Sequence, residues 1–171
     1  PLVLKRSESY IGTLIDDLVT KGTEEPYRMM TSRSEYRLVL RQDNADARLT
    51  AIGHRIGLVS DERLAAVEAK YAAVAQEIRR LEHTGIPGSD ALNALLTERG
   101  TTPVNDGCRL IDLLRRPQLS YADLRPFDPA PQTLAADVVE QVEITVKYEG
   151  YIQRQQKQVE EFERLERRLL P

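Results

Sequence analysis

Four arginines stand close together in the stretch "YRMMTSRSEYRLVLR", which contains no lysine, although the whole chain has a net charge of −3. A guanidinium group binds a carboxylate or a phosphate through two parallel hydrogen bonds, and it stacks on aromatic rings and bases. Two tyrosines lie between the arginines, and this mixture of charge and rings is typical of surfaces that bind single-stranded RNA. The candidate site residues are Arg28, Arg33, Arg37, Arg41, Tyr27 and Tyr36.

The positive charge is confined to one part of the chain. Between Pro26 and Arg55 the sequence has six arginines and three acidic residues, a net charge of +3, so the remainder carries −6. Arg33, Arg37 and Arg41 follow one another at helical intervals, and like charges at this spacing repel by roughly 0.2–0.5 kcal/mol per pair on an exposed helix. Either carboxylates from another packed segment or an anion from outside must offset this repulsion, and the sequence leaves both possibilities open.

The residues that most catalysts need are missing. Cys108 is the single cysteine and His54 and His83 are the only histidines, so no zinc site of familiar spacing can be built. The glycines form neither a dinucleotide-binding turn nor a phosphate-binding loop, and Cys108 is expected to be an idle thiol. Asp16 and Asp17 are expected to lie on a solvated helix face. An independent small enzyme is therefore the least favoured function.

The N-terminal third of the chain predicts a short amphipathic helix over residues 7–19, which Lys21 and Gly22 end. A second helix is predicted over residues 33–42, because Ser32 and Glu35 have the spacing of a helix-start capping box. A strand is the alternative there, since apolar and arginine residues alternate. On either reading the three arginines from position 33 to 41 share one face. Two short helical pieces are expected next, over residues 44–49 and 51–56, with a cap at position 50.

The remainder predicts an all-α fold. A helix that starts after Ser60 has apolar residues in a heptad pattern at positions 64, 67, 71, 74, 78 and 81. Shorter helices follow over residues 89–99, from Cys108 to Pro117, and from Ser120. A long helix is predicted from Thr133 to about Leu169, and we expect it to pack antiparallel against the heptad helix in a helical bundle. A glycine inside that helix costs about 1 kcal/mol, so Gly150 suggests close approach of another backbone, from this chain or a partner.

Length and composition fit one domain of a cytoplasmic protein. The chain has 171 residues, no window with the ~20 apolar residues that a membrane helix needs, and no signal peptide. A single cysteine fits a reducing compartment. The chain opens on Pro1 without an initiator Met, so it reads as a piece of a longer protein.

Three stretches carry a specific family resemblance. They are "YIGTLIDDLVTKGTEEPYRMMTSRSEYRLVLRQDNADARLT", "IGLVSDERL" and "VEITVKYEGYIQRQ". Together they resemble the C-terminal part of the GidA family, also called MnmG, the large flavoprotein subunit of the tRNA uridine 5-carboxymethylaminomethyl modification enzyme. The resemblance covers nearly the whole chain.

The resemblance implies that the flavin chemistry of the parent protein takes place outside this chain. The parent protein uses FAD, with NADH and methylenetetrahydrofolate, to install an aminomethyl-type group on carbon 5 of the wobble uridine of certain tRNAs, as a homodimer working with the GTPase MnmE. The flavin fold and its catalytic cysteines lie outside this chain, so no cofactor is expected here. Residues 1–30 resemble the connection from the flavin domain, and residues 31–171 a helical C-terminal domain. Separated from that domain, an apolar face around Tyr10–Leu18 is expected to be exposed.

Two roles for the chain follow as hypotheses. In the first, the arginines hold tRNA phosphates near the anticodon loop, so that they set the position of the tRNA without reading its bases. In the second, the chain is an interaction module whose long helix docks the GTPase while its arginines anchor the fold. The candidate docking residues on that helix are Tyr148, Gly150, Tyr151 and Arg154.

Overall fold

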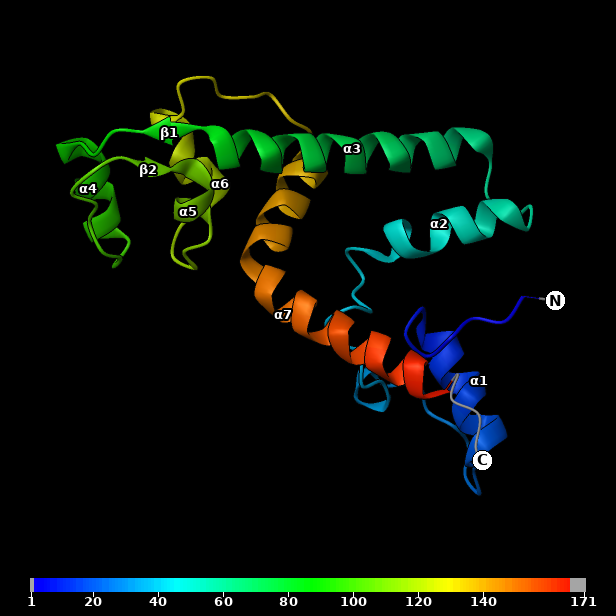
Figure 1. Cartoon of the computed structure of the whole chain (residues 1–171). Coiled ribbons are helices and arrows are strands. Elements are labelled where there is room, and N and C mark those ends of the chain that lie inside the picture. The colour runs from blue at the N-terminus through cyan, green and yellow to red at the C-terminus, as the bar shows by residue number, and fades with distance from the viewer. Residues whose placement is uncertain (1, 167–171) are drawn as a thin grey trace. The chain divides into compact units, whose positions relative to one another are not determined.

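The computed structural model describes residues 2–166, which form two compact units (Figure 1). The first unit combines residues 2–67 with residues 150–166, and the second contains residues 68–149. The helices α3 (Asp61–His83) and α7 (Ala136–Glu166) each run from one unit into the other. The two stretches that build the first unit are thus far apart in the sequence. The predicted domain boundary near residue 30 stays a prediction.

Helix α1 (Tyr10–Thr20) confirms the first predicted helix. Ser9 caps its start by accepting a 3.0 Å hydrogen bond from the backbone N–H of Gly12. Gly22, which has a φ of +68°, follows its end in the left-handed region that favours glycine. The buried face of α1 is polar and includes Asp17, whereas its apolar stripe at Ile11, Ile15 and Leu18 is exposed. The expectation of an exposed apolar face is therefore confirmed, and the solvated position expected for Asp17 is wrong.

The segment after α1 differs from the prediction. A single 3₁₀ turn, η1 (Thr31–Arg33), replaces the predicted helix over residues 33–42, and the strand alternative is also wrong. Ser34 is extended, with φ −99° and ψ 132°, and its hydroxyl accepts a 3.1 Å hydrogen bond from the backbone N–H of Tyr36. This local bond competes with helical pairing. The capping box at Ser32 does not form, because the Glu35 carboxylate binds Arg6 instead.

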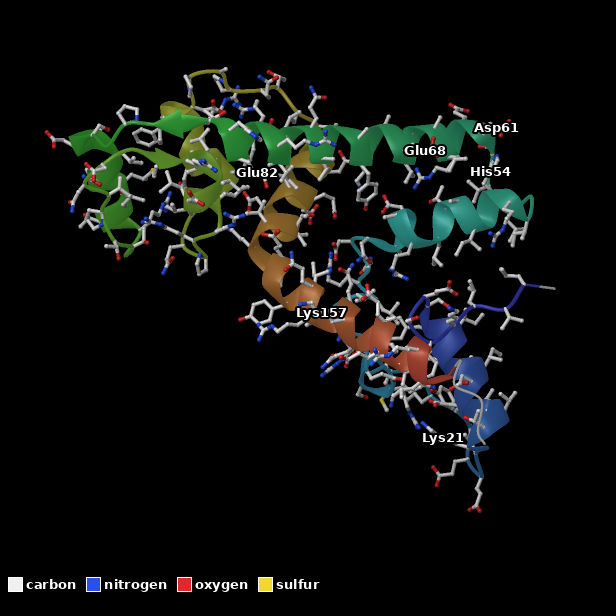
Figure 2. The ribbon with its side chains drawn as sticks, in the orientation of Figure 1. Lys21, His54, Asp61, Glu68, Glu82 and Lys157 are labelled. Atoms are coloured by element: carbon white, nitrogen blue, oxygen red, sulfur yellow. The ribbon has the colours of Figure 1, made fainter. Side chains whose placement is uncertain are left out.

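One continuous helix, α2 (Ala45–Arg55), follows in place of the two predicted short pieces. Thr50, expected to cap the second piece, is buried within α2. Nε2 of His54, near the end of α2, lies 2.6 Å from Oδ1 of Asp61 at the start of α3. Figure 2 labels both side chains. This pair joins the two helices across the loop that contains Gly57.

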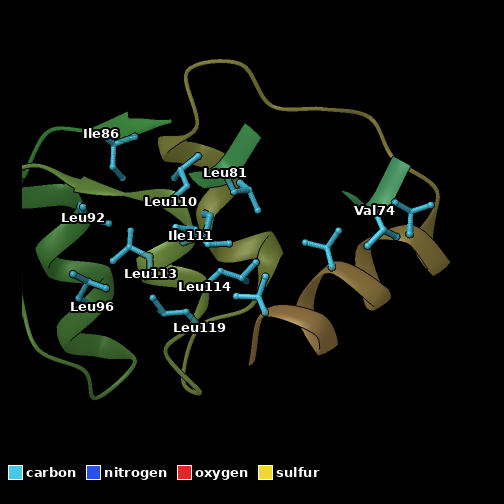
Figure 3. Close-up of a cluster of buried hydrophobic side chains, with 14 residues drawn as sticks. Val74, Leu81, Ile86, Leu92, Leu96, Leu110, Ile111, Leu113, Leu114 and Leu119 are labelled. Carbon is cyan, nitrogen blue, oxygen red and sulfur yellow. The ribbon is translucent and has the colours of Figure 1, made fainter. Parts of the chain in front are cut away.

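The second unit holds the larger apolar core, which Figure 3 shows in close-up. Leucines of α4 (Asp90–Glu98) and α5 (Leu110–Leu114) point toward one another and are fully buried. The predicted helices after Ser89 and Ser120 are confirmed. Ser89 caps the start of α4, and Ser120 forms a capping box at the start of α6 (Tyr121–Leu124). The 3₁₀ turn η2 (Arg125–Phe127) directly follows α6. Two short antiparallel strands, β1 (Gly85–Ile86) and β2 (Cys108–Arg109), were not predicted.

The heptad pattern of α3 does mark its inward side, since Val67, Val74 and Leu81 are buried. The predicted antiparallel packing with the long C-terminal helix is nevertheless wrong. Within the second unit, α7 begins beside α3 and then departs from it (Figure 1), without the extended side-by-side contact that such packing needs. Val142, in the first turns of α7, joins the same apolar cluster as Val74 and Leu81. The all-α class holds apart from the two-residue strands. No described helix is long and apolar enough to cross a membrane.

Candidate nucleic-acid interface

The candidate arginines lie in η1 and in the loops on either side of it, within the first unit. Their side chains have different partners. Arg41 pairs with Asp43 through two hydrogen bonds, Nε to Oδ1 at 2.9 Å and one terminal nitrogen to Oδ2 at 3.0 Å. Its other terminal nitrogen donates to the carbonyl oxygen of Leu38 at 2.6 Å. Arg41 is therefore neutralised inside the fold, which corrects its place among the candidate tRNA-binding arginines.

Arg33 and Tyr27 form a stacked pair. The guanidinium carbon of Arg33 lies 4.8 Å from the centre of the Tyr27 ring, which is within the range of a cation–π interaction. The Tyr27 hydroxyl donates a 2.8 Å hydrogen bond to Oδ2 of Asp17, and burial together with this bond raises the pKa of Tyr27. Arg33 itself stays exposed. Tyr27 thus holds the arginine in place from within the chain.

Arg28 and Arg37 are exposed, and within residues 2–166 neither guanidinium takes part in a hydrogen bond or an ion pair. Tyr36, the other candidate ring, is buried with an exposed fraction of 6%. It therefore has no open face on which a base could stack, which corrects its role in the predicted site. Of the six candidate residues, Arg28, Arg33 and Arg37 present their charge to solvent.

A network centred on Arg6 explains why nearby acids leave these arginines free. Arg6 binds both carboxylate oxygens of Glu35 at 2.9 Å, and it also contacts Asp16 at 2.9 Å and Asp17 at 2.7 Å. Its side chain is only 14% exposed. These bonds raise the pKa of Arg6, and the hydrogen bond from Arg6 is the main reason why the pKa of Glu35 is lowered. Glu35, which lies between Arg33 and Arg37 in the sequence, thus pairs with Arg6 and with neither of these two neighbours.

Asp17 is the buried anion of the same network, and its side chain is 7% exposed. It accepts hydrogen bonds from the Tyr27 hydroxyl, from Lys21 at 3.0 Å and from Arg6. These three bonds, with that of Tyr27 the largest, hold the pKa of Asp17 well below its usual range. Because the network fixes the end of α1, it also fixes Lys21, which Figure 2 labels and whose side chain remains 68% exposed.

The free cations surround a shallow, open depression of about 500 Å³. Its lining residues come from the two ends that flank α1, from η1 and from the turn that follows η1. They are Arg6, Lys21, Ser32, Arg33, Ser34, Glu35 and Arg37. Glu35 pairs with Arg6 and Lys21 pairs with Asp17, so Arg33 and Arg37 are the lining cations without a carboxylate partner among the described residues. Such a site can bind an anion through several N–H donors.

Residues that the sequence did not single out complete the site. Arg6, in "LKRSE", belongs to no motif of the sequence. Its partners Asp16, Asp17 and Glu35 are 10, 11 and 29 positions away. Gln155 of α7 was quoted only as part of a motif, yet its buried amide contacts the arginine segment at Val39. No local spacing could have identified either residue, because their partners are brought together by the fold.

The candidate docking residues lie along α7. In the second unit Tyr148 is 47% exposed, and in the first unit Tyr151 is 55% exposed. The Arg154 guanidinium carbon lies 4.9 Å from the centre of the Tyr151 ring, and its Nε donates to the carbonyl oxygen of Gly150 at 3.2 Å. No described atom lies within 4 Å of the position that a side chain at Gly150 would take. The close backbone approach suggested for Gly150 is therefore not made by the described part of this chain.

The other reactive groups have structural roles. Cys108 is half-buried, and burial raises the pKa of its thiol, which lowers the fraction of reactive thiolate. In the second unit, Glu77 is buried and binds Arg80 and the hydroxyl of Tyr121, whose pKa burial raises to about 12. Among the described residues no group of three or more His, Cys, Asp or Glu side chains is placed to hold a metal ion.

Comparison with known proteins identifies the chain. Residues 61–156 match the family model of the tRNA modifying enzyme MnmG/GidA C-terminal helical domain. The tRNA uridine 5-carboxymethylaminomethyl modification enzymes MnmG of Caldicellulosiruptor saccharolyticus and Lachnoclostridium phytofermentans are 56% and 53% identical over 99% and 100% of this chain, which spans 27% of their length. The structure of Aquifex aeolicus GidA superimposes on the whole chain, over 26% of its own length, with a TM-score of 0.80 and 34% sequence identity. The chain therefore belongs to the MnmG/GidA family.

Proposed function

We propose that this chain is the tRNA-positioning part of an enzyme that modifies carbon 5 of the wobble uridine. Two kinds of observation support the proposal. The relatives that match the whole chain are named as tRNA uridine 5-carboxymethylaminomethyl modification enzymes. In addition, Arg28, Arg33 and Arg37 face solvent without a carboxylate partner among the described residues, while Glu35 beside them pairs with Arg6. This second observation carries the proposal.

The surface suits phosphate groups. Each guanidinium presents two parallel N–H donors to phosphate oxygens, and the ammonium of Lys21 has three donors, of which one is used by Asp17. Arg33 is held over Tyr27, so little side-chain freedom is lost when it binds. Contacts of this kind fix where the tRNA backbone lies, and they carry no base specificity. The enzyme must also unstack the target uridine, which costs a few kcal/mol, and firm backbone contacts help to offset that cost.

The cofactors of the reaction belong to the rest of the parent protein in this proposal. FAD, NADH and methylenetetrahydrofolate would act there, and the flavin would supply redox chemistry for building the new substituent. The present chain does not fit a flavin site by itself, since it lacks the glycine-rich turn that cradles a dinucleotide pyrophosphate. Its contribution is confined to binding and orientation. A cytoplasmic homodimer is part of the same proposal.

A second candidate function is docking of the GTPase MnmE on α7. The exposed Tyr151 ring, with Arg154 stacked on it, resembles the aromatic and arginine residues that dominate protein interfaces. The open space at Gly150 would let a partner backbone approach the helix, and Tyr148 is also exposed. The two functions are compatible because they use different residues. Each can therefore be removed separately.

The test replaces Arg33 and Arg37 with Gln in the full-length protein and measures tRNA affinity at several salt concentrations. Each lost phosphate contact should lower the slope of log affinity against log salt by about 0.7–0.9, so the double variant should bind more weakly and with a smaller salt dependence. Arg63→Gln, an exposed arginine of α3 in the same unit, is the matched control. Parental affinity and slope in the double variant would refute the phosphate contacts.

The docking function has its own experiment. Tyr151→Ala with Arg154→Gln should weaken capture of the GTPase while leaving tRNA affinity at the parental value. If these substitutions leave GTPase capture unchanged, α7 does not dock the partner through this face.

A further inference from the structure

Gln155 lies on α7, and its side chain reaches the backbone of the arginine segment. The residue is buried, with an exposed fraction of 8%. Its amide oxygen accepts a 2.8 Å hydrogen bond from the backbone N–H of Val39, and its amide nitrogen donates a 3.1 Å hydrogen bond to the carbonyl oxygen of Glu35. Both contacts lie within the first unit. One amide thus binds the segment at two points, on either side of Arg37.

Arg37 lies inside a tight turn between those two points. The backbone N–H groups of Val39 and Leu40 donate to the carbonyl oxygen of Tyr36 at 3.0 and 2.9 Å. Tyr36 and Leu40 are buried at 6% and 2% exposure, which anchors both ends of the turn, while the Arg37 side chain points into solvent. The direction of the Arg37 guanidinium therefore depends on the conformation of residues 35–39.

The contacts require the chemistry of glutamine. A primary amide offers an acceptor and two donors on one planar group, so it satisfies a backbone N–H and a backbone C=O at the same time. A carboxylate at this position would accept from Val39 and repel the carbonyl oxygen of Glu35. A methionine side chain of similar length would do neither, and the two partly buried backbone groups would each lose a partner.

We propose that Gln155 is a positioning residue for tRNA binding, because it fixes the turn that presents Arg37 to the phosphate backbone. The proposal rests on the phosphate-binding function given above. Gln155 does not touch the RNA. It lowers the cost of binding by holding Arg37 in its binding arrangement beforehand.

The experiment measures tRNA affinity in the full-length protein for Gln155→Met, Arg37→Gln and the variant that carries both. Loss of one charge-assisted contact weakens binding by roughly tenfold, so Arg37→Gln should show a loss of that size and Gln155→Met most of it. Because Gln155 acts through Arg37, the double variant should bind no more weakly than Arg37→Gln alone. Independent effects would instead multiply.

Three further measurements separate positioning from general damage. Gln156→Met, an exposed neighbour on α7, should keep parental affinity. Hydrogen exchange at the Val39 amide should accelerate in Gln155→Met, while the melting temperature stays close to the parental value. Gln155→Glu, whose buried carboxylate accepts from Val39 but repels the carbonyl oxygen of Glu35, should weaken tRNA binding at least as much as Gln155→Met.

The outcomes distinguish the two proposals. If Arg37→Gln binds tRNA as the parent does, the phosphate-binding function fails, and the role of Gln155 fails with it. If Arg37→Gln weakens binding and Gln155→Met does not, only the positioning role is overturned. Multiplicative losses in the double variant would also overturn it, because they would show that Gln155 acts independently of Arg37.

Discussion

Replacing Arg6 with Gln tests the network that keeps carboxylates away from the free arginines. Arg6 donates to Glu35, Asp16 and Asp17, and it also reaches the carbonyl oxygen of Thr13 at 3.3 Å. A glutamine at this position is shorter and uncharged, so it cannot replace the bidentate pair with Glu35. The substitution therefore removes a single cation from three acidic partners at once.

The magnitude follows from how deeply each partner is buried. Asp16 and Glu35 have side chains 42% and 44% exposed, so each of their pairs contributes only about 0–1 kcal/mol. Asp17 is 7% exposed, and removing one partner of a buried ion pair costs about 3–5 kcal/mol. Since Asp17 keeps its bonds from Lys21 and Tyr27, the lower part of that range applies. Together with the two exposed pairs, this gives an expected loss of about 3–6 kcal/mol in the first unit.

Native-state hydrogen exchange of the α1 amides is the suitable assay, because it reports the opening free energy of this unit separately from that of the second. Arg63→Gln serves as the control, since this exposed arginine belongs to the same unit. Arg6→Gln should also weaken tRNA binding, because the released Glu35 carboxylate can then pair with Arg33 or Arg37. An opening free energy within about 0.5 kcal/mol of the parent would show that the network contributes little, and the reasoning would be wrong.

Further predictions concern the effect of low pH, two glycine substitutions and one substitution in the apolar core. The folded-state pKa of Asp17 lies well below its unfolded value of about 3.9. The stabilisation from the Asp17 carboxylate is therefore complete above the unfolded pKa and is lost as pH falls toward the folded pKa. The opening free energy of α1, measured by amide exchange, should be lower at pH 3 than at pH 7. Gly12→Ala should destabilise the first unit by about 2–4 kcal/mol, because the new Cβ would lie 2.2 Å from the carbonyl oxygen of Lys5; unchanged α1 exchange would contradict this. Gly150→Ala, with open space around it, should stabilise α7 by about 0.5–1 kcal/mol in urea unfolding. Leu92→Ala should cost about 2–5 kcal/mol in the same assay, since Leu92 is fully buried.

Local signals in the sequence predicted the helices well wherever the helix ends are determined locally. Gly22 follows the end of α1, Ser89 caps α4, and Ser120 begins α6, all as expected. In each case the deciding interaction joins residues within five positions of one another. The heptad pattern of α3 likewise marks its buried side, because side chains three and four apart share a helix face.

Prediction failed where distant segments determine the backbone. The segment after Ser32 has a correct capping-box spacing, but Arg6 takes its Glu35 carboxylate and Gln155 binds the backbone at Val39. These partners satisfy groups that a helix would have used. The antiparallel packing of α3 and α7 failed for a related reason. A hydrophobic stripe shows which side of a helix is buried and does not show which helix covers it.

The charge of the arginine surface was predicted only in part, because local pairs and distant segments both determine it. A count over residues 26–55 gave a net charge of +3, which suggested a local concentration of positive charge. Such a count cancels charges without showing which residues pair. Arg41 pairs with Asp43 two positions away, whereas Glu35 pairs with Arg6, which lies outside the counted range at a separation of 29 positions. The charge that faces solvent therefore comes from fewer arginines than the count includes. Glu35, the acid between Arg33 and Arg37, pairs with neither of them. Since Arg6 and Gln155 both act on residues 35–39, the free charge at Arg37 depends on the tertiary fold, and loss of that fold should abolish phosphate binding without any change to the arginines themselves.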